Sequence, residues 1–316
     1  MNALIIGAGG FVGKYLIDSL NSAGYNVSAT KLNFEQFNDN ICKTCSVYDL
    51  DICSDGQIAE ILQKSQPDVV FHLAALSSVM ISWKNVKKTF EINTLGAINL
   101  LESVRNYNKN VRIVLIGSSE EYGFTSGSKM PVSEYAVVNP NNPYAISKLS
   151  QSCLGRMYAE AFNMNVVIMR AFNHIGPMQP LGFVVPDFCH QIAAIERGKM
   201  DNTIITGNLE AMRDFTDVRD ITQGYIACAE KATSGEIYNI GSGRAVSIKW
   251  ILDYLCSLST ADIKVKIDPA KIRPIEVPVV QADITKITAQ TGWKTRYTIE
   301  QSLENTLNYW RSKDNI

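Results

Sequence analysis

The hydrophobic residues of the chain fall into short, uniform runs that are rich in β-branched side chains. Such runs predict strands, and they occupy Ala3–Ile6, Val27–Ala29, Val69–Phe71, Val111–Ile116 and Val166–Met169. Neighbouring positions within each run are both apolar, which is typical of strands whose sheet is covered by helices on both faces.

Helical patterns lie between these strands. They cover Phe11–Ala23, Gly56–Lys64, Val86–Asn106 and Tyr144–Phe162, and glycine, proline or asparagine stands near their ends. Strands that alternate with helices of this length indicate βαβ units. We therefore expect an α/β fold with a doubly wound parallel sheet.

The alternation changes after Arg170, where prolines and turn residues separate shorter elements. The segment from Val218 to Ile240 again has the pattern of a helix followed by a strand. We therefore expect a first domain over 1–170, to which the chain returns at about 216–240. A smaller α/β domain would consist of 171–215 and 241–316.

Composition narrows the classes of function. Thirty Lys and Arg against 31 Asp and Glu leave a net charge of −1, so no overall field attracts nucleic acid or an anionic membrane. No apolar run approaches the roughly 18 residues of a membrane span, and the N-terminus lacks the basic segment of a signal peptide. Seven scattered cysteines fit a reducing compartment. We expect a cytoplasmic protein.

A metal site is not expected. Cys42 and Cys45 have the spacing of half a zinc site, but no second pair follows. Cys53, the nearest other cysteine, stands at an unsuitable spacing.

Candidate chemistry begins directly after the first strand, in the run Gly7-Ala8-Gly9-Gly10-Phe11-Val12-Gly13. Gly7 permits a tight turn, Gly10 lets the backbone approach a pyrophosphate, and Gly13 allows helix and sheet to pack closely. The N-terminus of the following helix adds amides and a positive dipole end. The alternative is an ordinary glycine-rich turn, but this position on the first strand favours dinucleotide binding.

The end of the second strand bears on which dinucleotide is bound. An acidic residue there accepts a hydrogen bond from the ribose 2′-hydroxyl, whereas a basic residue accommodates a 2′-phosphate. The sequence at this point is Ala29-Thr30-Lys31-Leu32, without an acid. Lys31 favours NADP(H), and NAD(H) stays possible because Lys31 could equally be a solvated lysine.

Tyr144 and Lys148 are four residues apart, which places phenol and ammonium on one face of a helix. Ser118 follows a strand whose carboxyl end would lie over the cofactor. A phenol has a pKa of about 10, and the positive charge of Lys148 would favour the phenolate. We predict that Ser118, Tyr144 and Lys148 are catalytic. A second pair with this spacing, Tyr309 and Lys313, lacks the surrounding motifs.

Several segments in order now resemble a known family. The run Gly7–Gly13, Asp51-Ile52, His72-Leu73-Ala74-Ala75, Asn93-Thr94-x-Gly96, Ser118 and Tyr144-x-x-x-Lys148 resemble the extended short-chain dehydrogenase/reductases that act on nucleotide sugars. Arg170–Pro177, Gly207–Phe215 and Arg273-Pro274-x-Glu276-Val277 resemble the branch of GDP-mannose 4,6-dehydratases and GDP-6-deoxy-4-keto-mannose reductases. The run Gly117–Gly123 and the segment Asn173–Pro177 are nearer the reductases.

This resemblance, which is nearly full length, implies roles for further residues. The cofactor would contact Phe11, Val12, Asp51, Ile52, Leu73, Ala74, Ala75 and Asn93. The substrate would contact Ser77, Ser119, Asn173, Arg213, Arg273 and Glu276, with the two arginines on the diphosphate and Glu276 on a ribose. Guanidinium groups suit phosphate oxygens, although Arg213 and Asp214 could also form only a local salt bridge.

The resemblance implies reduction of a 4-keto GDP-sugar, with Tyr144 as proton donor. Glu120 falls where the dehydratases have their base, so 4,6-dehydration is the alternative, followed by C4 oxidation or epimerisation. A dinucleotide sensor without turnover is a hypothesis from another class. The resemblance also implies a role in deoxysugar biosynthesis for a surface polysaccharide, and a homodimer formed through the helices Val86–Asn106 and Tyr144–Phe162.

Overall fold

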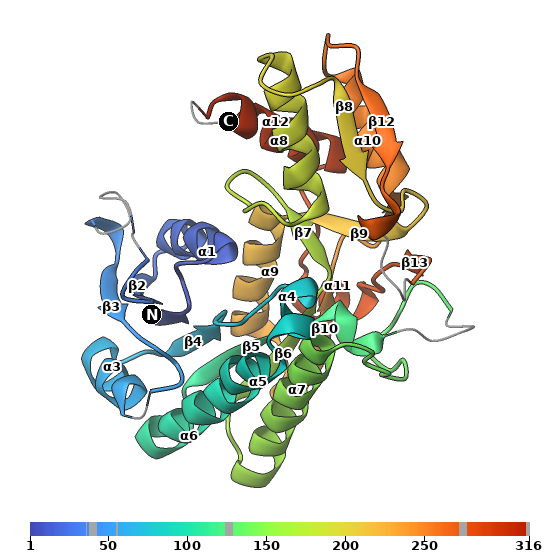
Figure 1. The fold of residues 1–316 in the computed structure, drawn as a ribbon. Coiled ribbons are helices and arrows are strands. Elements are labelled where there is room, and N and C mark those ends of the chain that lie inside the picture. The colour runs from blue at the N-terminus through green and yellow to red at the C-terminus, as the bar shows by residue number, and fades with distance from the viewer. Residues whose placement is uncertain (36, 38–42, 55, 124–128, 272–276, 314–316) are drawn as a thin grey trace.

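A seven-stranded parallel sheet forms the centre of the first part of the chain (Figure 1). The computed structural model describes residues 1–35, 37, 43–54, 56–123, 129–271 and 277–313. The strand order is β10-β6-β5-β4-β1-β2-β3. The strands are β1 (Asn2–Ile6), β2 (Asn26–Lys31), β3 (Ser46–Asp49), β4 (Val69–His72), β5 (Arg112–Ser118), β6 (Val166–Ala171) and β10 (Ile237–Ile240). The predicted doubly wound parallel sheet is confirmed.

Both faces of the sheet are covered by helices, and this explains the continuous apolar runs. In β1, Ala3 and Ile5 belong to one apolar cluster, whereas Leu4 and Ile6 belong to a second cluster on the opposite face. The first cluster includes residues of α1 (Phe11–Ser22), α9 (Val218–Lys231) and α11 (Thr285–Thr291). The second includes residues of α3 (Gln57–Ser65), α6 (Gly96–Asn108) and α7 (Pro143–Phe162).

The chain returns to this sheet late in the sequence. After α9, β10 pairs in parallel with β6, so that Ile237 lies opposite Ile168. The helix and strand expected between Val218 and Ile240 are therefore present. The division into two domains at the boundaries given above stays a prediction.

The long helix expected over Val86–Asn106 is interrupted. It consists of α5 (Val86–Phe90), the π-helical turn η1 (Glu91–Leu95) and α6, and the short α4 (Val79–Lys84) precedes it. Within η1 the buried side chain of Asn93 accepts a hydrogen bond from the Leu76 N–H (2.8 Å) and donates to Ser147 Oγ (2.9 Å). The π-helical turn thus joins the loop after β4 to α7. Such turns often occur at functional sites.

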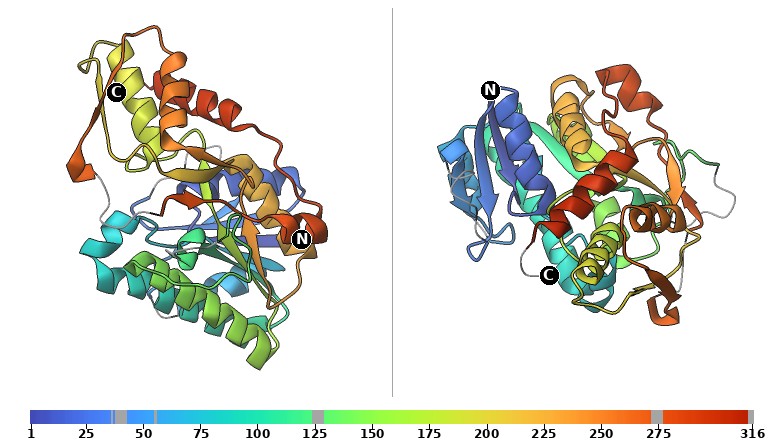
Figure 2. Two further views of the ribbon diagram at one scale, coloured as in Figure 1. Left: turned by 90° about the vertical axis from the view of Figure 1, so that its right-hand side faces the viewer. Right: turned by 90° about the horizontal axis from the view of Figure 1, so that it is seen from above.

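The remaining elements form a smaller layer above the sheet (Figure 1). Three helices, α8 (Val184–Glu196), α10 (Ile248–Ser257) and α12 (Ile299–Arg311), share one apolar cluster with residues such as Phe188, Ile251 and Leu303. The strands of this layer are β7 (Asn173–Ile175), β8 (Thr203–Thr206), β9 (Met212–Asp217), β11 (Ala245–Ser247), β12 (Lys264–Ile267) and β13 (Val279–Val280). Two short 3-10 turns are also present: η2 (Ser119–Tyr122) follows β5, and η3 (Pro269–Lys271) follows β12. Figure 2 shows this layer from two further directions.

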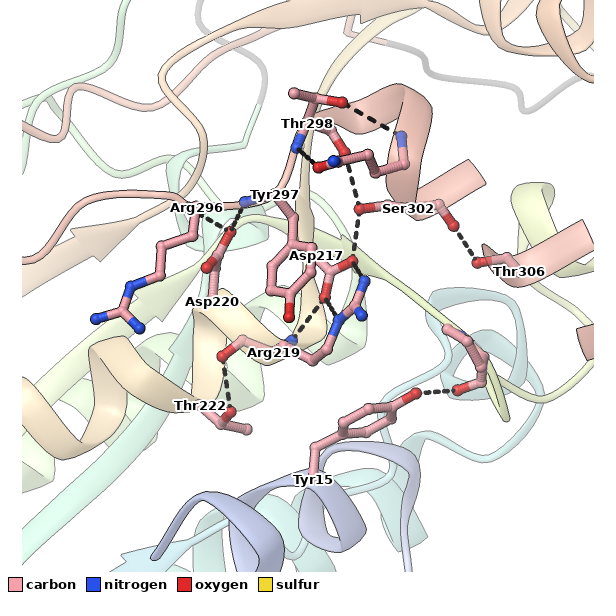
Figure 3. A network of polar contacts seen from close by, with 12 residues as sticks. Tyr15, Asp217, Arg219, Asp220, Thr222, Arg296, Tyr297, Thr298, Ser302 and Thr306 are labelled. Carbon is pink, nitrogen blue, oxygen red and sulfur yellow. Dashed lines mark hydrogen bonds and ion pairs between the residues drawn. The ribbon is translucent and has the colours of Figure 1, made fainter. Parts of the chain in front are cut away.

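A polar network joins the two parts (Figure 3). Asp217 ends β9 and caps α9, and its carboxylate accepts hydrogen bonds from the Arg219 guanidinium (2.7 Å) and from Ser302 Oγ of α12 (2.6 Å). The Arg219 guanidinium also lies 3.5 Å from the centre of the Tyr297 ring. On α1, the Tyr15 hydroxyl donates to the carbonyl of Pro177 (2.9 Å). The network fixes β9 relative to the helices of the sheet.

Two sequence expectations concern membranes and metals. Among the described residues, no helix is long and apolar enough to cross a membrane. Cys42 lies outside the described residues, whereas Cys45 lies within them and is half-buried. Within the described ranges, no group of three or more His, Cys, Asp and Glu side chains is arranged to hold a metal ion.

Candidate active site

The glycine-rich loop between β1 and α1 is tightly packed on one side and open on the other. Gly7 has φ +85°, and a Cβ atom there would stand 2.6 Å from the backbone of Ala74. A Cβ at Gly10 would meet nothing closer than the Gly7 carbonyl at 3.8 Å, and no side chain caps the N-terminus of α1 there. Free amides beside open space fit a pyrophosphate. The loop therefore suits a dinucleotide, with Phe11 and Val12 in the first helical turn.

In the folded chain, acidic side chains from other segments lie near the end of β2. The Lys31 ammonium, whose side chain is 17% exposed, pairs with Asp49 Oδ1 of β3 at 2.5 Å. Glu35, four residues beyond Lys31, accepts a hydrogen bond from the Leu32 N–H (2.9 Å). Glu35 lies beyond the segment Ala29–Leu32, which contains no acid, but the turn after β2 brings its carboxylate back to the glycine-rich loop at Gly9.

The loop after β4 closes the floor of the site. The N–H groups of Leu73 and Ala74 both donate to the Ile6 carbonyl at 2.9 Å. Ala75 is half-buried and Ser77 is exposed. Their roles, and that of Asn93, stay predictions.

Asp51 and Ile52 lie beyond β3. Asp51 is exposed and its carboxylate accepts from the Cys53 N–H (3.0 Å), whereas Ile52 is buried in the cluster between α3 and α6. Ile52 thus has a packing role in any case. Whether either residue meets an adenine stays a prediction.

Ser118, Tyr144 and Lys148 converge at the carboxyl end of β5. Ser118 is the last residue of β5, and Tyr144 lies in the first turn of α7, which packs against that strand. The Ser118 side chain lies close enough to the Tyr144 phenol to lower its pKa. One turn further along α7, the buried Lys148 ammonium donates to the Ile116 carbonyl (2.7 Å) and to Gln151 Oε1 (3.0 Å).

The electrostatics of this group favour a protonated phenol. Burial raises the pKa of Tyr144 above its usual value; the contact with Ser118 opposes this, and the carboxylates of Glu120 and Glu121 add to it. Burial lowers the pKa of Lys148 to about 8, while Glu121 partly offsets the effect. Desolvation therefore dominates the Tyr144 pKa in the chain without cofactor. The expectation that Lys148 together with an oxidised nicotinamide favours the phenolate stays a prediction.

Glu120 lies beside Tyr144 and is held by the start of α7. Asn142 caps this helix by accepting from the Ala145 N–H (2.8 Å), and its amide donates to Glu120 Oε2 (3.1 Å). The Glu120 N–H donates to Ser118 Oγ (3.2 Å). Both Glu120 and the neighbouring Ser119 are half-buried. The carboxylate is therefore positioned next to the proton donor that we predict.

Glu121 is a buried residue that the sequence analysis did not select. One of its oxygens accepts from the Ser118 N–H (2.9 Å) and from Ser152 Oγ (3.0 Å). The other accepts from Arg170 Nε (2.8 Å), and both side chains of this ion pair are almost fully buried. Arg170 could have signalled it, since a charge inside the apolar strand β6 requires a buried partner.

The predicted substrate residues lie on the strands above the sheet. Asn173 of β7 is exposed and pairs with Phe215 of β9. Arg213, also on β9, donates from Nη1 to the carbonyls of Met212 (2.9 Å) and Val277 (2.7 Å). Arg273 and Glu276 lie outside the described residues.

Asp214, the neighbour of Arg213, has structural partners. Its carboxylate accepts hydrogen bonds from the N–H groups of Ser242 (2.7 Å), Gly243 (2.9 Å) and Ala282 (3.1 Å). These bonds join β9 to the loop after β10 and to the segment after β13. The proposed role of Arg213 on a diphosphate stays untested by this geometry.

The parallel sheet, the glycine-rich loop and the Ser118, Tyr144 and Lys148 group define an oxidoreductase of the extended short-chain dehydrogenase/reductase type. Within that class, the chain belongs to the family described as GDP-mannose 4,6 dehydratase, whose model matches residues 4–306.

Individual relatives have related activities. A GDP-6-deoxy-D-mannose reductase from Pseudomonas aeruginosa is 32% identical over 78% of this chain and 81% of its own length. A GDP-6-deoxy-D-talose 4-dehydrogenase from Aggregatibacter actinomycetemcomitans is 28% identical over 97% of this chain and 98% of its own. The structure of RMD from Pseudomonas aeruginosa complexed with NADPH has a TM-score of 0.88 and 28% identity, and covers 99% of both chains.

Proposed function

We propose that the protein reduces the 4-keto group of a GDP-6-deoxyhexose, such as GDP-6-deoxy-4-keto-mannose, to the alcohol. The observation that supports this most strongly is the position of the buried Tyr144 phenol beside Ser118 at the carboxyl end of β5, where burial raises the phenol pKa and so keeps its proton. Reduction of a ketone begins from a protonated acid, whereas oxidation begins from its conjugate base. The reductase activity named for the 32% identical relative supports the same direction.

The chain's own residues would divide the work as follows. When bound, NADPH supplies the hydride that is added to C4. Ser118 donates a hydrogen bond to the substrate carbonyl oxygen, and Tyr144 transfers its proton to that oxygen, so the ketone becomes a secondary alcohol. The Lys148 ammonium, one helical turn along α7, would stabilise the phenolate that remains. We favour NADP(H) because RMD is complexed with NADPH, and NAD(H) stays possible.

Dehydration of GDP-mannose is the second candidate, because Glu120 lies beside Tyr144 and could remove a C5 proton. The test combines two incubations. With GDP-6-deoxy-4-keto-mannose and NADPH, we expect NADPH oxidation and a GDP-6-deoxyhexose product. With GDP-mannose and catalytic cofactor alone, we expect no 4-keto-6-deoxy product.

Glu120→Gln sharpens this test, since it removes the base but keeps the size and the contact with Asn142. Reduction should fall by less than about 100-fold, because no step of hydride transfer requires this carboxylate. Release of a 4-keto-6-deoxy sugar by the native protein, lost in Glu120→Gln, would replace the reductase with the dehydratase.

The assembly and setting are also part of the proposal. Leu95, Met157 and Phe162, on the helices expected at the dimer contact, are exposed large apolar residues, which supports a homodimer. Light scattering should then give twice the chain mass of 35.0 kDa, and a single chain mass would exclude the dimer. We place the reaction in cytoplasmic deoxysugar biosynthesis for a surface polysaccharide.

A further inference from the structure

The carboxyl end of β2 combines one cation with two carboxylates. The Lys31 ammonium is paired with Asp49 at 2.5 Å. The next residue, Leu32, donates its N–H to Glu35 Oε2 at 2.9 Å. A phosphate that approached Lys31 would therefore enter a region in which acidic groups already lie.

Glu35 is held in a closed turn. Its N–H donates to the Leu32 carbonyl (3.0 Å), and its carboxylate accepts from the Leu32 N–H. Two hydrogen bonds therefore join the first and last residues of the turn from Leu32 to Glu35. A Cβ atom added at Gly9 would collide with this carboxylate. The carboxylate of Glu35 thus lies directly against the glycine-rich loop.

This position has a chemical consequence for a bound dinucleotide. In folds of this type the glycine-rich loop holds the pyrophosphate, and an acidic residue about 20 positions later accepts from the ribose 2′-hydroxyl. Glu35 stands at about that separation from Gly13. A 2′-phosphate in the same place would bring its negative charge against the Glu35 carboxylate, and the two like charges would repel each other.

We propose that Glu35 is a cofactor-specificity residue: it accepts a hydrogen bond from the 2′-hydroxyl of NAD(H) and opposes the 2′-phosphate of NADP(H). Lys31 acts in the opposite direction by attracting that phosphate. The two residues together limit the preference for NADP(H) and permit use of NAD(H). The proposal rests on the dinucleotide dependence of the proposed function.

The test measures binding to the purified full-length protein without sugar. Calorimetric titrations with ADP-ribose and with 2′-phospho-ADP-ribose isolate the adenosine end of the cofactor, and NADH and NADPH provide the complete pair. Glu35→Gln keeps an acceptor for the Leu32 N–H and removes only the charge. We expect the ratio of dissociation constants to shift about tenfold or more toward the phosphorylated ligand, as for a lost charge-assisted contact. Lys31→Ala should shift the ratio in the opposite direction.

The matched control is Glu60→Gln, which removes the same charge from an exposed partner of Lys64 on α3. Its ratio should equal that of the native protein. A ratio within about twofold of native in Glu35→Gln, or an equal weakening of both ligands, would overturn the proposal. The titrations contain no sugar, so they test Glu35 independently of keto-sugar reduction. A shifted ratio of dissociation constants in a protein that does not reduce the keto sugar would refute only the proposed function. Reduction of the keto sugar together with an unshifted ratio would refute only the role of Glu35.

Discussion

Removing one partner of the buried Glu121 and Arg170 pair should destabilise the protein strongly. The Glu121 side chain is not exposed at all, and that of Arg170 is 4% exposed. In Glu121→Leu the guanidinium would stay buried without its carboxylate, a change that costs about 3 to 5 kcal/mol. The Ser118 N–H and the Ser152 hydroxyl would also lose their acceptor, so we expect the upper part of that range.

The double variant Glu121→Leu with Arg170→Met separates charge from packing. Replacing both partners of a buried ion pair by apolar groups is often nearly neutral, so the double variant should recover at least about 2 kcal/mol of the single loss. Urea denaturation followed by circular dichroism measures both free energies of unfolding. Glu60→Gln, at an exposed pair, should leave the free energy of unfolding nearly unchanged.

The reasoning would be refuted by a loss below about 1 kcal/mol in Glu121→Leu, because the pair would then be solvated in solution. It would equally be refuted by a double variant less stable than the single one. Such a result would mean that other contacts of Arg170, such as its position over the Tyr122 ring, outweigh the cost of its unpaired charge.

Two other predictions concern the reacting groups. Tyr144→Phe should leave dinucleotide binding nearly unchanged and lower kcat by about 100-fold to 10,000-fold. Tyr309→Phe, in the second tyrosine–lysine pair, should leave kcat unchanged. Retention of most activity in Tyr144→Phe would exclude Tyr144 as the proton donor. Because the pKa of Lys148 is about 8, kcat/KM for reduction should decline as the pH rises through that value, when the ammonium beside the phenolate is lost. Glu121→Gln should move the decline to lower pH, since this carboxylate raises the Lys148 pKa; identical profiles would show that Glu121 has only a structural role.

The central fold could be predicted because its signal is local. Strands β1, β4, β5 and β6 are buried on both faces, so each one is a continuous apolar run. Strand β3, at the edge of the sheet, has no buried residue and was missed. In β9, Asp214 and Asp217 are buried with hydrogen-bond partners, and acidic residues conceal a strand from any pattern based on hydrophobicity.

In the site, too, the residues with a local sequence signal were predicted and those that depend on distant partners were missed. Ser118, Tyr144 and Lys148 were selected because their spacing follows from one strand end and one helical face, and the structure brings them together. Glu121 and Glu35 were missed because their importance depends on partners that only the folded chain supplies. Arg170 is distant from Glu121 in sequence, and the contact of Glu35 with Gly9 depends on the turn after β2.

The order of elements explains how the strands that we predict to bind substrate are held relative to the side chains that we predict to react. Strand β6 runs almost directly into β7, and β9 runs through Asp217 into α9, which packs beside α1. Asp217 is bonded at once to Arg219 and to Ser302 of α12 (Figure 3). A sugar held by β9 must bring its C4 atom to roughly 3 to 3.5 Å from the reacting groups. Because β9 is anchored at this point to a helix of the sheet, the separation between Arg213 and Tyr144 is set by the fold itself rather than by a flexible linker.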